Sequence, residues 1–179
     1  MRAAARRLGR HGLCRCGRRL SWKTAVMTPA VTALERSGVA FDLAPYHHDP
    51  TTEAYGLEAA TALGVAPARV FKTLVVTGER MYLGIVPVTH RLSLKQMALA
   101  VGERRVAMCP PADAERATGY VVGGISPFGT RRPVSAVIDA SVRDHDTVYV
   151  SGGRRGLDIC IGVDDLIEVS GAIVHSIAV

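Results

Sequence analysis

The sequence predicts an α+β domain built on a mixed β-sheet that curls toward a partly barrel-like form, with helices around it. Segments with the period-two alternation of strands outnumber segments with helical periodicity. The strands do not follow a strict β-α-β order, which argues against an all-parallel sheet. No internal repeat and no interdomain linker interrupts residues 27–179, which we expect to form one domain.

Helices are expected at 28–37, 53–63, 93–101, 110–118 and 164–169. Thr28 can cap the first helix, Pro29 fits its first position, and Gly38 can end it. Strands are expected at 39–46, 70–76, 81–88, 105–109, 134–138, 147–150, 157–161 and 172–177. The residues 77–80 between the second and third strands are typical of a hairpin turn.

Bulk composition excludes several protein classes. An apolar content of 48% with 21% charged residues excludes a disordered or fibrous chain. No apolar run approaches the roughly 20 residues that span a bilayer, so no membrane association is expected. The cysteines Cys14, Cys16, Cys109 and Cys160 form no disulfide framework, and a cytoplasmic location is expected.

The net charge of +6 suggests nucleic-acid binding, but this charge is unevenly distributed. Residues 1–26 hold eight basic residues and no acidic one, whereas the chain from Met27 holds 14 basic and 16 acidic residues, a net charge of −2. We therefore expect residues 27–179 to bind RNA only locally and weakly. Segment 1–26 is expected to lie outside the domain. Upstream sequence from too early a start codon is favoured over a transit peptide or a disordered basic arm.

Lys72 is the most informative single residue. At period two, Val70, Lys72, Leu74 and Val76 share one face of a strand whose two faces are both largely apolar. An ammonium group there loses solvation unless it is paired. The alternative is a lysine that reaches solvent along the strand. Asp158, in an apolar strand, could pair with Lys72, bind a substrate amine, or face solvent.

Two glycine-rich loops, 123–129 and 151–156, each lie beside an arginine pair, Arg131/Arg132 and Arg154/Arg155. Glycine lets backbone amides approach a ligand closely, and arginine suits phosphate or carboxylate. The loops favour a pocket for an anion or a nucleotide end, with ordinary turns and solvated arginines as the alternative. No metal site is expected at His47 and His48, because adjacent residues of an extended chain point apart.

Several ordered stretches match a known family: Met27-Thr28-Pro29-Ala30-Val31; Tyr46 with His48-Asp49-Pro50; Phe71-Lys72-Thr73-Leu74; residues 118–127, TGYVVGGISP; and residues 149–158, YVSGGRRGLD. They resemble the YbaK/EbsC family, the Cys-tRNA(Pro)/Cys-tRNA(Cys) deacylases related to the editing domain of prolyl-tRNA synthetase. The match covers the chain from Met27 to Val179 and omits segment 1–26.

The resemblance implies roles for particular residues. The family's key lysine corresponds to Lys72, its aspartate to Asp158, and its Gly-x-x-x-Pro loop to Gly123 and Pro127. Lys72 and Asp158 are therefore the expected catalytic residues. The expected substrate-binding residues are Tyr46, Gly123, Gly124, Ser126, Pro127, Ser151, Gly152 and Gly153.

The activity implied by the resemblance is removal of cysteine from mischarged Cys-tRNA(Pro). The thiol of the attached cysteine would attack its own ester carbonyl, so no protein nucleophile, metal or cofactor is expected. Expected partners are the tRNA acceptor end and prolyl-tRNA synthetase. The alternatives are an Ala-tRNA(Pro) deacylase, a non-catalytic module that binds tRNA or a synthetase, and an unrelated small-nucleotide binder.

Overall fold

The computed structural model describes residues 27–179, so the expectation for segment 1–26 lies outside the described residues. Within that range, eight strands form one mixed sheet, and five α-helices and two 3-10 helices surround it. The predicted α+β class with a mixed sheet is confirmed. In the part of the chain described, the end strands of the sheet do not pair with each other, so the sheet is open.

The elements follow the predicted order closely. The helices are α1 (Pro29–Ser37), α2 (Tyr55–Leu63), α3 (Leu94–Val101), α4 (Pro111–Thr118) and α5 (Val163–Ser170), with 3-10 helices η1 (Pro67–Arg69) and η2 (Ala140–Asp144). The strands are β1 (Phe41–Pro45), β2 (Val70–Thr77), β3 (Met81–Pro87), β4 (Ala107–Met108), β5 (Ser135–Asp139), β6 (Thr147–Arg154), β7 (Leu157–Gly162) and β8 (Ile173–His175).

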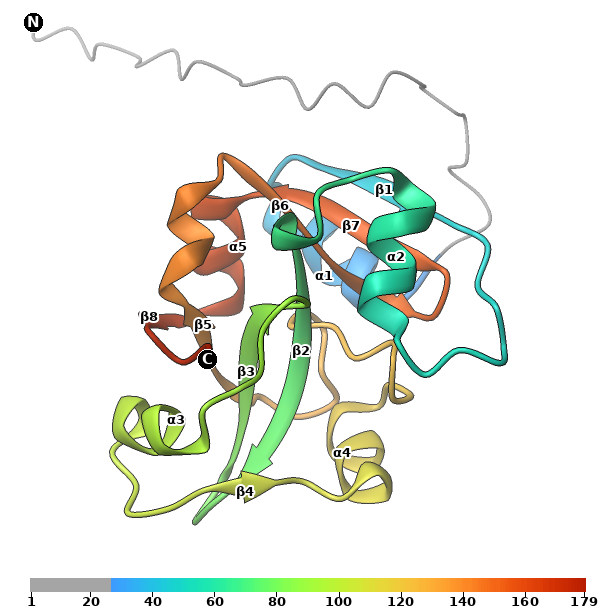
Figure 1. The fold of residues 1–179 in the computed structure, drawn as a ribbon. Coiled ribbons are helices and arrows are strands. Elements are labelled where there is room, and N and C mark those ends of the chain that lie inside the picture. Colours follow the sequence, from blue (N-terminus) through green and yellow to red (C-terminus); the bar gives the residue numbers. More distant parts are fainter. Residues whose placement is uncertain (1–26) are drawn as a thin grey trace, which may run out of the picture.

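The sheet runs in the order β1-β7-β6-β2-β3-β5-β8, with β4 paired to β2 beside this path. Strands β2 and β6 are parallel, as are β3 with β5 and β5 with β8, and the other pairs are antiparallel. Figure 1 shows β6 and β7 crossing the upper part of the molecule, while β2 and β3 descend from them as a hairpin. The site described below lies where these two groups of strands meet.

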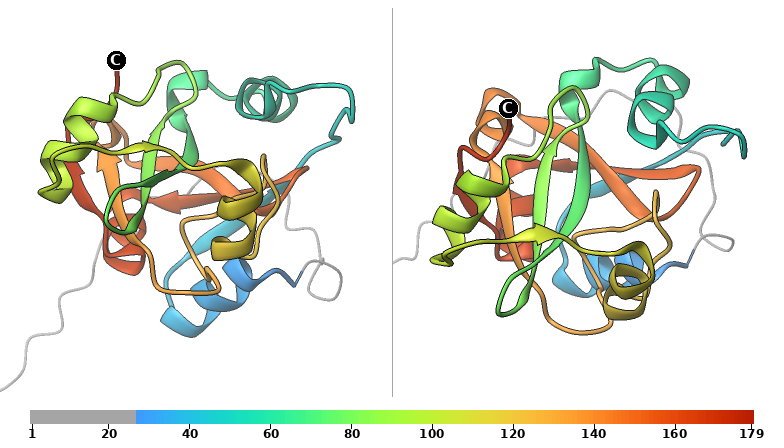
Figure 2. Two further views of the ribbon diagram at one scale, coloured as in Figure 1. Left: turned by 90° about the horizontal axis from the view of Figure 1, so that it is seen from below. Right: turned by 60° about the horizontal axis from the view of Figure 1, so that its bottom comes forward.

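Helices cover both faces of the sheet. One face packs against α1, α4 and α5 in the largest apolar core. The other face is covered by α3 over β2, β3 and β5, and by α2 over β2, β6 and β7. Figures 1 and 2 show α2 and α4 beside the same edge of β2, at different heights along that strand.

Local sequence signals explain the start of α1 and the length of β6. Thr28 Oγ1 accepts a hydrogen bond from the Val31 amide at 3.2 Å, which confirms the predicted cap. Strand β6 is longer than expected, because Gly152 and Gly153 continue it as a bulge against β7 instead of ending it. The Thr28 hydroxyl also donates to the Gly152 carbonyl at 2.5 Å, so the start of α1 is docked on this bulge.

Among residues 27–179, no helix has both the length and the apolar character needed to cross a bilayer.

Candidate functional site

The sheet register places three polar residues in one row across β7, β6 and β2. Asp158 of β7 is directly opposite Ser151 of β6. On its other side β6 runs parallel to β2, and Val150 pairs with Phe71. One residue further along both strands, Lys72 lies beside Ser151. The neighbouring row on this face consists of Cys160, Tyr149 and Val70, which pack together under α2. Lys72, Ser151 and Asp158 therefore share one face of the sheet.

This polar row opens into a cavity of about 520 Å³. The start of α2, the middle of β2, the start of α4 and the first glycine-rich loop form its walls. Most of its lining is apolar. Five of the predicted site residues lie in the lining: Tyr46, Lys72, Gly123, Ser151 and Asp158. A volume of this size lies in the range of roughly 300–1,000 Å³ that is typical of small-molecule sites.

Lys72 is half-buried in this cavity and has no ion-pair partner within 4.0 Å among residues 27–179. The predicted alternation is confirmed, since Val70 and Val76 lie on the same face of β2 while Phe71 and Val75 enter the opposite core. Burial, together with the charge of Arg91, lowers the pKa of the Lys72 ammonium. Of the alternatives left open for Asp158, the pairing with Lys72 is not formed among residues 27–179, so the cation remains available to a ligand.

Asp158 is a buried carboxylate without a partner. The residue is 5% exposed, and residues 27–179 supply its side chain with neither a hydrogen bond nor an ion pair. Burial raises the pKa of Asp158 to about 7. Burial and then the nearby charge of Asp158 raise the pKa of Tyr46 to about 12, so its hydroxyl stays protonated beside the carboxylate.

The first glycine-rich loop contributes only part of its length to the cavity. Gly123 lines it and has a φ of +84°, and a Cβ there would come within 2.8 Å of the Tyr55 ring. Gly124, Ser126 and Pro127 are buried and do not line it. The Gly124 amide donates to the Val121 carbonyl at 2.9 Å, and Ser126 Oγ accepts from the Phe128 amide at 3.3 Å.

The second glycine-rich loop contributes Ser151 but not Gly152 or Gly153 to the cavity lining. Ser151 Oγ accepts a hydrogen bond from the Gly153 amide at 3.3 Å, which holds the turn. The two loops touch, because a Cβ on Gly124 would lie 2.8 Å from the Arg154 Cα. Five predicted residues therefore meet at the cavity, and the other five lie in the loops that support it.

Strand β2 also offers the cavity a free backbone edge. It pairs with β6 at residues 70–71 and with β4 at 76–77, which leaves a gap between them. The Val88 amide donates to the Val70 carbonyl. The backbone amides and carbonyls of the even-numbered residues of β2 therefore face β3, and those of the odd-numbered residues face the gap. Thr73 lies at this gap, and its Oγ1 is sealed from solvent and has no hydrogen-bond partner among residues 27–179.

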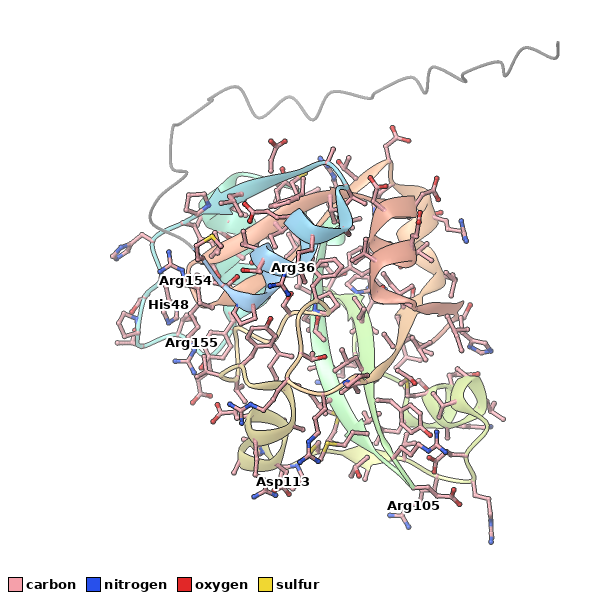
Figure 3. The ribbon with its side chains drawn as sticks, turned by 180° about the vertical axis from the view of Figure 1, so that it is seen from behind. Arg36, His48, Arg105, Asp113, Arg154 and Arg155 are labelled. Atoms are coloured by element: carbon pink, nitrogen blue, oxygen red, sulfur yellow. The ribbon has the colours of Figure 1, made fainter. Side chains whose placement is uncertain are left out.

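Sequence reasoning missed Tyr55 and did not separate Arg155 from Arg154. Tyr55 begins α2 and lines the cavity, and the Arg155 guanidinium lies 4.7 Å from the centre of its ring. Figure 3 shows Arg154 and Arg155 beside His48 at one side of the molecule. Nothing in the local pattern of the sequence brings residue 155 to residue 55, because the contact depends on strand order.

His48 does not belong to a metal site in the described residues. Its Nδ1 lies 2.9 Å from Glu58 Oε2, and the other oxygen of Glu58 accepts from the Asp49 amide at 2.5 Å. Glu58 of α2 thus fixes the loop between Tyr46 and α2. Within residues 27–179, no three His, Cys, Asp or Glu side chains are grouped so that they could hold a metal ion.

The cavity lining in the described residues contains no histidine, and Cys109 is its one thiol. Burial and then the charge of Asp113 raise the pKa of the Cys109 thiol, which keeps it protonated at neutral pH. A protonated thiol is a poor nucleophile, and Ser151 has no histidine beside it to act as a base. This arrangement favours binding and charge stabilisation over covalent attack by the protein.

Comparison with known proteins gives a consistent result. The family model for the aminoacyl-tRNA editing domain matches residues 49–169. A protein of Enterococcus faecalis named as a candidate Cys-tRNA(Pro)/Cys-tRNA(Cys) deacylase, EbsC, is 31% identical over 113 residues, which cover 62% of this chain and 69% of that protein. The uncharacterized protein YwhH of Bacillus subtilis is 27% identical over 122 residues, covering 67% of this chain and 77% of that protein.

A similar solved structure is that of a candidate trans-editing enzyme for prolyl-tRNA synthetase. It superimposes with a TM-score of 0.77 and 25% sequence identity, and covers 87% of this chain and 99% of that chain. The similarity therefore extends over almost the whole of the described fold.

Proposed function

Because this chain belongs to the aminoacyl-tRNA editing domain family, we propose that it removes cysteine from mischarged Cys-tRNA(Pro). The observation that carries the proposal is the unpaired Lys72 cation and the unpaired Asp158 carboxylate in one cavity, on either side of Ser151. An aminoacyl ester has a cationic amino group and a polar carbonyl a few bonds apart. The Asp158 carboxylate complements the amino group, and the Lys72 cation in the same row complements the carbonyl.

Asp158 binds the amino group of the attached amino acid. A buried carboxylate without a partner loses solvation, and a bound ammonium group restores a favourable interaction. Tyr46 and Ser151 flank this position, since the charge of Asp158 acts on Tyr46 and Ser151 lies opposite it across the sheet. The amino group therefore fixes which way the ester faces.

Lys72 and the backbone edge at Thr73 face the ester. The cation stabilises negative charge that develops on the ester oxygens during the reaction. The Thr73 amide and the loop at Gly123 supply backbone groups near the carbonyl oxygen. In the supporting loops, Gly124, Ser126, Pro127, Gly152 and Gly153 hold these contacts in place.

The nucleophile in this proposal is the thiol of the substrate. Its sulfur forms a bond to the ester carbonyl carbon while the bond from that carbon to the ribose oxygen breaks. The thiol proton passes to the departing oxygen, so the products are a cyclic thiolactone of cysteine and tRNA with a free hydroxyl. An intramolecular attack of this kind gains greatly in effective concentration, which accounts for a cavity without an activated protein nucleophile.

A deacylation panel tests the substrate. The protein is incubated with tRNA(Pro) charged with cysteine, alanine or proline, and the remaining aminoacyl-tRNA is measured over time. The proposal predicts fast release of cysteine and slow release of the two amino acids that lack a thiol. Equal or faster release of alanine would instead assign an Ala-tRNA(Pro) deacylase. Absence of release from all three would favour a module that binds tRNA or a synthetase without catalysis.

We place this activity in the cytoplasm, where tRNA charging takes place, with the tRNA acceptor end as substrate and prolyl-tRNA synthetase as partner. The two cysteines among residues 27–179, Cys109 and Cys160, are not joined in a disulfide with each other, which agrees with a reducing compartment. The chemistry described requires no metal and no organic cofactor.

A further inference from the structure

We propose that Arg155 is a phosphate-binding residue at the mouth of the cavity, where it holds a backbone phosphodiester of the tRNA acceptor end. This inference rests on the proposed function, and it assigns a second binding position outside the cavity. The observations that carry it are the contacts that fix the guanidinium group, the absence of a carboxylate partner, and the position of the group relative to the cavity.

Two contacts hold the guanidinium group of Arg155 in one plane. Its Nε donates a hydrogen bond to the Val122 carbonyl at 2.9 Å, and its central carbon lies 4.7 Å from the centre of the Tyr55 ring. Both Val122 and Tyr55 line the cavity, whereas Arg155 does not. The group therefore lies at the rim, on the surface that Figure 3 shows with Arg154 and His48.

The remaining donors of Arg155 are available for a ligand. Among residues 27–179 it has no ion-pair partner within 4.0 Å, and its hydrogen bond to Val122 uses Nε alone. A planar guanidinium group whose two terminal nitrogens are free matches two oxygens of a phosphate. Because its conformation is already fixed, binding costs less side-chain entropy than it does for a mobile arginine.

Glu115 supports the backbone segment to which Arg155 is bound. Glu115 Oε1 accepts a hydrogen bond from the Val122 amide at 2.8 Å. The Val122 residue is thus held through its amide by Glu115 and through its carbonyl by Arg155. Arg154 is exposed like Arg155, but no hydrogen bond or ion pair of the Arg154 side chain is present in the described residues.

The chemistry of the substrate identifies the ligand as a phosphate. In an aminoacyl-tRNA the carboxyl group of the amino acid is esterified and carries no charge. When this ester lies beside Lys72 and Asp158, the polynucleotide must leave through the cavity mouth. The only anionic groups that it can present there are its backbone phosphates.

The test compares Arg155→Ala with the wild-type protein on two substrates. One is Cys-tRNA(Pro), and the other is the cysteinyl ester of adenosine, which has no phosphate. We expect the KM for Cys-tRNA(Pro) to rise roughly ten-fold, which corresponds to about 1.4 kcal/mol, with little change in kcat. The kinetics on the adenosine ester should remain within about two-fold of wild type. The dependence of log kcat/KM on log salt should become shallower by about one unit.

Two controls accompany this comparison. Arg143→Ala removes the same charge from η2, away from the cavity lining, and should leave both substrates unaffected. Arg155→Lys keeps the charge but loses the planar pair of donors, and should give an intermediate KM for Cys-tRNA(Pro). Unfolding midpoints of all variants show whether each one is folded.

An equal loss on both substrates would overturn the inference, because Arg155 would then only shape the cavity through Tyr55 and Val122. An unchanged KM for Cys-tRNA(Pro) would overturn it as well. A wild-type protein that releases cysteine from neither substrate would contradict the proposed function instead. In that case the binding of an uncharged acceptor-stem RNA, measured by fluorescence anisotropy, decides. The inference predicts roughly ten-fold weaker binding by Arg155→Ala, and equal binding would refute it.

Discussion

At the scale of single residues, the unpaired carboxylate of Asp158 is the feature with the clearest energetic consequence. It is 5% exposed, and its pKa is raised to about 7 by burial. An aspartate in water has a pKa near 3.9, so the folded protein holds the Asp158 proton more tightly than the unfolded chain does. The folded state therefore pays a cost for ionising a group that the proposed mechanism uses in its ionised form.

This cost predicts a pH dependence of stability. Because the pKa of Asp158 is higher in the folded state, its contribution to the free energy of unfolding decreases as the pH rises from about 4 to about 7, and then stays constant. Asp158→Asn should therefore be more stable than wild type at pH 8, by up to a few kcal/mol at about 1.4 kcal/mol per pKa unit. The difference should shrink at pH 5. Urea unfolding at both values measures it, and a variant less stable at pH 8 would contradict this account.

The same residue predicts the opposite effect on activity. Deacylation of Cys-tRNA(Pro) should decline as the pH falls through 7, since Asp158 becomes protonated and no longer attracts the substrate amino group. Asp158→Asn should lose at least ten-fold in kcat/KM and should lack this acidic limb. The pH profiles of kcat/KM for the two proteins provide the measurement. A variant that is both stabilised and fully active would exclude Asp158 from binding the amino group.

At the scale of elements, the site depends on strand register and on the contact between two glycine-rich loops. Asp158, Ser151 and Lys72 are brought into one row by the adjacent strands β7, β6 and β2. The loops at Gly124 and Arg154 touch so closely that Gly124 leaves no room for a Cβ. The contact between Gly124 and Arg154, which lies outside the cavity lining, thus positions the loop residues that line the cavity.

Gly124→Ala should reduce deacylation by at least ten-fold, because the new methyl group would lie 2.8 Å from the Arg154 Cα and would push the loops apart. Gly64→Ala is the matched control. It places a Cβ in open space at the end of α2 with a φ of +65°, and should cost about 1 kcal/mol of stability without loss of activity. Steady-state kinetics and thermal unfolding of both variants separate the two effects. Full activity in Gly124→Ala would show that the loop contact does not position the cavity.

The elements also show what the sequence could predict. The helices followed from local signals such as the Thr28 cap and the glycines that end α1 and α2. The face of β2 that carries Lys72 followed from period-two alternation. The row with Ser151 and Asp158 did not, because strand order and register depend on contacts between segments far apart in the sequence. For the same reason, local patterns left the pairing of Lys72 and Asp158 open.

At the scale of the whole molecule, charge limits how the protein meets RNA. Residues 27–179 carry 14 basic and 16 acidic residues, so the domain lacks the broad positive field of general RNA-binding proteins. The phosphate contact proposed for Arg155 is local. We therefore expect the protein to work best on tRNA that another protein already holds.

This expectation predicts a rate effect of prolyl-tRNA synthetase. At limiting concentrations of the deacylase, adding the synthetase should accelerate the release of cysteine from Cys-tRNA(Pro), since the partner raises the local concentration of substrate. A synthetase that charges a different tRNA is the control. Initial rates with and without each synthetase provide the measurement, and equal rates would count against a synthetase partner.

The most direct measurement of the central claim is single-turnover deacylation of Cys-tRNA(Pro) by Lys72→Ala. The control is Lys95→Ala, which removes an exposed lysine of α3 outside the cavity lining. With Lys72 supplying the cation of the polar row, Lys72→Ala should slow the reaction at least ten-fold, or about 1.4 kcal/mol, while Lys95→Ala keeps the wild-type rate. An undiminished rate in folded Lys72→Ala would contradict the account, because the cavity would then perform its chemistry without the charge on which this interpretation depends.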